Sequence, residues 1–229
     1  MDLQTAFFYP KQDPEWVKKT LTLFLCYLFI LTIPAAAGYQ IRAARMAANG
    51  QNVLPDWDDF IGLYVEGLRL WLSNMAINTI ISAMIMLIVA ILFIVPFLGA
   101  IVIEFAGTFD KEIISVINNL LSASFSFTQI GIQCLIATFT QIFVFTSLAE
   151  FNTWQAPFEI DRFKFFFKGR FGDAFKLLTM QILVTLCAIL LIVLTLLAGS
   201  VFIIPYAALV QSALAGQFIQ EGKKEPDFV

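Results

Sequence analysis

The sequence contains no histidine, and only 14% of its 229 residues are charged. The missing imidazole excludes Ser-His-Asp and Cys-His nucleophile activation and every metal site that needs a histidine ligand. Cys26, Cys134 and Cys187 form no Cys-x-x-Cys pair and lie in apolar runs, which favours buried hydrophobic side chains over ligands. No P-loop, GxGxxG or GxSxG is present. We therefore expect a protein that is not an enzyme and binds no metal or cofactor.

The sequence is unusually rich in apolar residues. Apolar residues make up 59% of the chain, and the mean hydropathy is +0.83. A soluble domain has about 45–50% apolar and about 25% charged residues. Four uncharged stretches together hold 137 residues: they lie between Lys19 and Arg42, Arg69 and Glu104, Glu112 and Glu150, and Lys176 and Glu221. Because a crossing helix needs only about 20 such residues, this composition indicates an integral membrane protein. A net charge of −3 without a basic domain excludes a nucleic-acid partner.

The fold class predicted is all-α, a polytopic bundle of about six transmembrane helices in one domain over residues 1–229. Pro14 begins the first helix and Pro96 ends the second, because proline suits a first turn and breaks an interior. A single helix over 177–220 would be about 66 Å long, so that stretch is expected to divide at Gly199-Ser200 and Pro205. The predicted helices are Pro14–Gly38, Leu70–Val95, Phe97–Phe109, Ser124–Glu150 and two within 177–220. If the chain folds back at Pro34 instead, residues 35–49 would form a further re-entrant or crossing helix.

The polar segments suggest how the chain lies in the membrane. Segments 39–71 and 151–175 are predicted to be amphipathic and interfacial, whereas 1–19 and 221–229 are polar ends. Interface anchors are expected at Trp16, Lys18, Lys19, Arg162, Lys164, Lys168 and Arg170. With both termini inside, ten Lys and Arg residues lie inside and four outside. The positive-inside rule therefore favours the cytoplasmic membrane of a prokaryote, with both termini cytoplasmic.

An internal repeat is a further pattern. Phe93–Phe97 matches Phe202–Tyr206, and at the same offset Phe105–Gly107 matches Leu214–Gly216. With three crossings in each copy, the second copy would be inverted in the membrane, as in many transporters. The pattern is compatible with an inverted 3+3 repeat, although short apolar matches also arise by chance in so biased a composition.

Several short motifs resemble a known family. They are Asp13-Pro14-x-Trp16-x-Lys18-Lys19, Gly38-Tyr39-x-x-Arg42-x-x-Arg45, Gly50, Leu54-Pro55-x-Trp57-x-Asp59 and Gly67, with Tyr206-Ala207-x-Leu209-Val210 and Gly216-Gln217-Phe218 near the end. They resemble the prokaryotic membrane proteins grouped as domain of unknown function 4013. The resemblance implies a multi-helix integral membrane protein and brings no activity, substrate or catalytic residue with it.

Few polar residues are candidates for function. Glu104 is an acidic residue within an apolar helix, where a carboxylate is costly, so we expect it to be buried and to face Arg42 or Arg45. Asp56, Asp58 and Asp59 suit the positive start of a helix, or else a cation or partner site. Gln129 and Gln133 indicate hydrogen bonds between helices, or else a polar pathway. Ala208, Ser212 and Gly216 form a small-residue stripe for close helix packing within the chain or against a partner.

Two functions fit these features. The first is a non-enzymatic accessory or scaffold subunit that binds another membrane protein, a second copy of itself or lipid. It is favoured by the lack of catalytic constellations. The alternative is a small transporter or channel-like protein with a polar site near Glu104. The repeat and the proline-interrupted helices favour this alternative.

Overall fold

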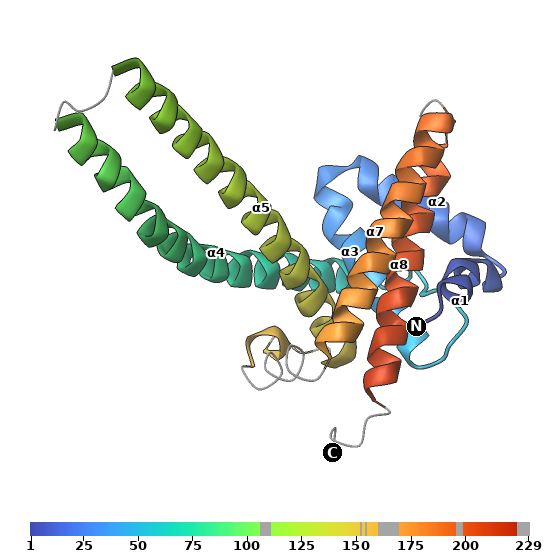
Figure 1. Cartoon of the computed structure of the whole chain (residues 1–229). Coiled ribbons are helices and arrows are strands. Elements are labelled where there is room, and N and C mark those ends of the chain that lie inside the picture. Colours follow the sequence, from blue (N-terminus) through green and yellow to red (C-terminus); the bar gives the residue numbers. More distant parts are fainter. Residues whose placement is uncertain (106–110, 152, 154, 160–169, 196–198, 224–229) are drawn as a thin grey trace. The chain divides into compact units, whose positions relative to one another are not determined.

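The computed structural model describes residues 1–105, 111–151, 153, 155–159, 170–195 and 199–223, and in these ranges the chain forms helices joined by loops, without a strand (Figure 1). The elements are α1 (Leu3–Phe8), η1 (Pro10–Gln12), α2 (Trp16–Leu28), η2 (Ile30–Thr32), α3 (Ile33–Ala48), α4 (Phe60–Phe105), α5 (Lys111–Phe151), η3 (Ala156–Phe158), α7 (Phe171–Leu194) and α8 (Ser200–Gly222). The predicted all-α class is confirmed.

Within these residues, four helical segments are long and apolar enough to cross a membrane: Phe60–Ile88, Ser122–Phe151, Phe171–Leu194 and Ser200–Gly222. The prediction was about six. With 13 and 16 residues, α2 and α3 are only about 20 and 24 Å long. Helices of that length are too short to cross the roughly 30 Å hydrocarbon core alone.

The predicted first helix, Pro14–Gly38, is wrong as one element, because the chain turns between α2 and α3. Phe29 has an extended backbone (φ −107°, ψ 119°). The Thr32 hydroxyl lies 2.8 Å from the Cys26 carbonyl oxygen and 2.9 Å from that of Phe29, and it can donate its proton to either. Pro34 then lies in the first turn of α3, where its missing N–H costs nothing. The fold-back alternative is the one observed: residues 39–48 belong to α3, and Tyr39, Ile41, Ala43, Ala44 and Ala48 are buried there.

The two prolines predicted to interrupt helices lie inside them. Pro96 is within α4 and Pro205 is within α8, so the predicted break at Pro96 is wrong. A helix surrounded by hydrocarbon keeps its remaining backbone hydrogen bonds, because no water competes for them. The division of 177–220 is confirmed at Gly199-Ser200, since α8 begins at Ser200. The predicted end of the third helix at Phe109, by contrast, lies outside the described residues.

The chain forms two compact units, and unit 1 comprises Met1–Asn74 and Ile142–Val229. In unit 1, α8 contacts α1, α2, α3 and α7. Backbones approach closely at two places along α3. A Cβ at Gly38 or Gly67 would overlap a carbonyl oxygen across the α3–α4 crossing, and one at Gly216 would overlap Ala44 of α3. Small residues thus let the backbone of α3 approach that of α4 at one place and that of α8 at the other.

Unit 2 comprises Met75–Gln141, parts of α4 and α5 that pair with each other. Ser82 Oγ donates to Gln133 Oε1 at 3.1 Å, and Gln129 Nε2 lies 3.6 Å from Met86 Sδ. Ser82 pairs with Gln133, and Met86, further along α4, pairs with Gln129, which comes earlier in α5. The two helices are therefore antiparallel. Here the two glutamines hydrogen-bond between helices, which is the simpler of the two roles expected for them.

Candidate functional site

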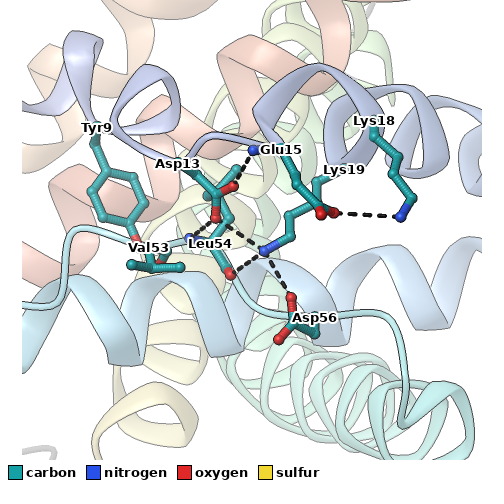
Figure 2. Close-up of polar contacts among 8 residues, drawn as sticks. All are labelled: Tyr9, Asp13, Glu15, Lys18, Lys19, Val53, Leu54 and Asp56. Carbon is teal, nitrogen blue, oxygen red and sulfur yellow. Dashed lines mark hydrogen bonds and ion pairs between the residues drawn. The ribbon is translucent and has the colours of Figure 1, made fainter.

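Charged side chains of the N-terminal motifs form two clusters in unit 1, and Lys19 lies at the centre of the first (Figure 2). Its Nζ donates to Asp13 Oδ2 and to the Leu54 carbonyl oxygen, both at 2.9 Å, and lies 2.8 Å from Asp56 Oδ1. Asp13 also accepts from the backbone N–H of Leu54 at 2.9 Å and of Glu15 at 2.7 Å. These bonds hold the start of α2 against the loop between α3 and α4.

Asp13 and Lys19 are buried, with 1% and 6% of their surface exposed. Burial alone would raise the pKa of the Asp13 carboxyl, but hydrogen bonds from Lys19, Leu54 and Glu15 outweigh it and hold that pKa below its usual value. Burial likewise opposes the charge on Lys19, yet its bonds to Asp56 and Asp13 raise the pKa of the ammonium. Both groups therefore stay charged, as a bonded pair.

Aromatic residues surround this pair. The Tyr9 hydroxyl lies 3.2 Å from the Ala43 carbonyl oxygen and 3.1 Å from that of Val53, and its single proton can be donated to either. Tyr39 and Trp57 stack with centroids 4.2 Å apart and an interplanar angle of 7°. The loop that carries Val53, Leu54 and Trp57 is thus fastened to α3 and to the segment before α2.

A second cluster joins α3 to the start of α4 and the end of α5. Arg42 donates to Glu66 Oε1 at 2.9 Å and to Asp59 Oδ2 at 2.7 Å. Arg45 lies 3.6 Å from Glu66 Oε2 and donates to the carbonyl oxygens of Ala149 at 3.1 Å and Leu148 at 3.3 Å. A guanidinium suits these carbonyls, because the last turn of a helix leaves them unbonded and partly negative.

Asp56 and Asp59, two of the acidic residues before α4, have different partners. Asp59 Oδ1 accepts from the backbone N–H of Gly62 at 3.0 Å, which caps the start of α4. The hydrogen bonds from Arg42 and from Gly62 lower the pKa of the Asp59 carboxyl. Asp56 pairs with Lys19. Two of the three clustered carboxylates are therefore engaged by this chain's own donors.

The predicted contact of the Glu104 side chain with Arg42 or Arg45 falls outside the described residues. Glu66 and Asp59 form ion pairs with Arg42, and Glu66 also lies 3.6 Å from Arg45. Sequence reasoning missed Glu66. The available signal was the arginine pair itself, since two cations three residues apart on a mostly buried helix need a nearby carboxylate. Over the described part of the chain, no three His, Cys, Asp or Glu residues are grouped so that they could hold a metal ion.

The predicted interface anchors are placed differently from one another. Lys18 has an exposed side chain paired with Glu15 at 3.3 Å, and Trp16 is half-buried, whereas Lys19 points into the protein. Arg170 is also buried: it donates to the Phe218 carbonyl oxygen and lies 3.9 Å from the centroid of the Phe218 ring. The three remaining anchors, Arg162, Lys164 and Lys168, lie outside the described residues.

The small-residue stripe Ala208, Ser212 and Gly216 lies on α8, and its last residue, Gly216, packs against α3 of the same chain. Ser212 and Gly216 are buried and Ala208 is half-buried. Gly216 lies against Ala44 and Ala47 of α3, so this position packs within the chain.

Comparison with known proteins gives a family but no activity. Residues 21–197 match the family described as protein of unknown function DUF4013. Uncharacterized protein MJ1189 of Methanocaldococcus jannaschii is 26% identical over 156 residues, which is 68% of this chain and 45% of that protein. The chain therefore spans less than half the length of this curated relative. No solved structure matches. Because the family match covers most of the chain, the protein belongs to the DUF4013 family of proteins of unknown function.

Proposed function

We propose that the protein is a non-enzymatic accessory or scaffold subunit of a prokaryotic cytoplasmic membrane, with both termini cytoplasmic, that binds another membrane protein. The observation that carries this proposal is the way the family-like motifs are used. Asp13, Lys19, Arg42 and Asp59 bond to one another or to their neighbours within unit 1. Side chains engaged in this way build a rigid framework, whereas a transport or catalytic site needs polar groups turned toward a substrate.

Unit 2 supplies the surface for a partner in this proposal. Its hydrogen-bonding side chains Ser82 and Gln133 face each other, while large apolar residues such as Leu87, Leu120 and Phe127 are exposed. An antiparallel pair of this kind can pack against the apolar helices of another membrane protein without leaving a polar group unsatisfied.

The test is to isolate the full-length protein from its native membrane with a photo-reactive amino acid at Phe127, which is 77% exposed on α5. We expect cross-linking to a membrane protein that also co-purifies in fixed stoichiometry. Leu190, 60% exposed on α7 in unit 1, is the matched control position and should give lipid adducts only.

A monodisperse particle without a stoichiometric partner would overturn the accessory role. In that case a flux assay comparing the protein with Glu104→Gln tests the transporter alternative. Reporter fusions at Asn52, expected outside, and Gly169, expected inside, test the orientation independently.

A further inference from the structure

A groove of about 390 Å³ lies in unit 1, between α7 and α8 on one side and α1, η1 and the start of α2 on the other. Its volume falls within the roughly 300–1,000 Å³ that ligand pockets occupy. The side formed by α7 and α8 is apolar: α7 contributes Leu183 and Leu191, and α8 contributes Phe202 and Ile203. These two helices are candidate spans, so in a membrane the groove would open to the hydrocarbon region.

One side of the groove carries the aromatic residues Phe7, Trp16 and Tyr206. The Tyr206 ring centroid is 5.5 Å from that of Phe7 and 6.1 Å from that of Trp16. The Tyr206 hydroxyl donates to the Phe7 carbonyl oxygen at 2.5 Å, which fastens α1 to α8. Tryptophan and tyrosine gather where hydrocarbon meets headgroups, so this side fits the level of the membrane interface.

Lys11 is the cationic residue of the groove lining. Its Nζ lies 5.8 Å from the ring centroids of Phe7 and Phe8 and 6.0 Å from that of Tyr206. Its side chain is exposed, and no carboxylate of the described residues lies within ion-pair distance of it. Lys18 and Lys19 differ in this respect, since both are paired. The aromatic rings therefore hold an available positive charge beside an apolar groove.

We propose that this groove binds one anionic membrane lipid, with a hydrocarbon chain along α7 and α8 and the headgroup phosphate on Lys11. A peptide segment fits less well, because its backbone N–H and C=O groups would find almost no polar partner along these walls. A free phosphate would leave the apolar walls unexplained. The site depends on the protein lying in a membrane, and it stands whether or not unit 2 binds a protein partner.

The first test concerns the headgroup. The full-length protein is reconstituted with equal amounts of phosphatidylglycerol and phosphatidylcholine, and lipid retained after detergent extraction is counted by native mass spectrometry. We expect one retained lipid per chain, with phosphatidylglycerol preferred. Lys11→Gln should reduce that preference about fivefold, the usual effect of one lysine near anionic lipid. Lys18→Gln removes another exposed positive charge, one outside the groove lining, and should leave the preference unchanged.

The second test concerns the hydrocarbon chain and uses a matched pair of exposed cysteines. Cys187 lines the groove, whereas Cys134 lies on α5 in unit 2. Cys187→Trp should fill the groove and abolish lipid retention, and Cys134→Trp should not. Thermal unfolding in detergent checks that both variants fold. Equal retention of the two lipids by the unaltered protein, retention unaffected by Cys187→Trp, or a lipid-free dimer would each overturn the proposal.

Discussion

The two units are both helical, yet different interactions hold their helices together. In unit 1, short helices are joined by buried charges, by capping side chains and by glycines at which backbones touch. In unit 2, long stretches of α4 and α5 pair through Ser82 and Gln133 while much of their apolar surface is exposed. The N-terminal motifs that resemble the family all lie in unit 1.

This difference shows where the sequence is specific. A long apolar helix is satisfied by its own backbone bonds and by hydrocarbon, so many sequences serve equally well. A short helix that turns back, as α3 does, depends on particular side chains to close its ends and to let its neighbours approach. We therefore expect substitutions in unit 1 to cost more stability than chemically similar ones in unit 2.

The largest effect is expected from Asp13→Ala. It leaves the buried Lys19 ammonium without one of its two carboxylates and the Leu54 N–H without its acceptor. Losing one partner of a buried ion pair costs about 3–5 kcal/mol. Thermal or denaturant unfolding in detergent measures the loss. Glu15→Ala, which removes an exposed pair with Lys18, is the control and should cost less than about 1 kcal/mol.

Gly67→Ala should come next, with a loss of about 1–3 kcal/mol from overpacking. The new methyl group would overlap the Pro34 carbonyl oxygen, and a backbone atom cannot move aside as a side chain can. Gly131→Ala in unit 2 is the matched control, since nothing lies within 4 Å of the added atom. There alanine should be neutral or stabilise the helix by up to about 1 kcal/mol, measured by the same unfolding experiment. Equal losses at both positions would contradict the comparison.

A smaller loss of stability is expected when the pH is lowered. The pKa of Asp13 is lowered on folding, so its contribution to stability is complete above the unfolded value near 3.8 and is lost as the pH falls through the lower folded value. Unfolding temperatures recorded from about pH 7 down to about pH 3 should therefore fall at the acid end. Asp13→Asn should flatten that fall in part only, because Asp59 also has a lowered pKa. An identical acid profile in the variant would show that the Asp13 pair contributes nothing.

The smallest effect is expected from Gln133→Leu in unit 2. This change removes the bond from Ser82 but leaves an apolar residue in an apolar setting. Hydrogen bonds between membrane helices average about 0.6 kcal/mol. A double-mutant cycle with Ser82→Ala isolates the pair. A coupling of several kcal/mol would mean that unit 2, like unit 1, depends on specific polar contacts.

The sequence predicted the helical class, the membrane-like composition and the division at Gly199-Ser200 because those follow from composition, length and turn residues. It did not predict that Pro96 lies within a helix, and it offered the turn between α2 and α3 only as an alternative, at Pro34. Proline and glycine rules describe helices in water, and the surroundings of the helix decide the outcome. Glu66 was missed because its role depends on the approach of α4 to Arg42, a contact between residues 24 positions apart. The family-like motifs were visible, but their pairing, such as Tyr39 with Trp57, required the fold.

The contact between Ala44 and Gly216 has a consequence for synthesis of the chain. These residues are 172 positions apart, and a ribosome adds about 5–20 residues each second. For roughly 10–30 s after α3 has been made, α8 is not yet synthesised, so the small-residue face of α3 stays uncovered. During that interval α3 is a short helix of mostly small and polar residues without its α8 neighbour. The early contacts of Lys19 and Arg42 with the loop and the start of α4 are the ones available to hold it in place.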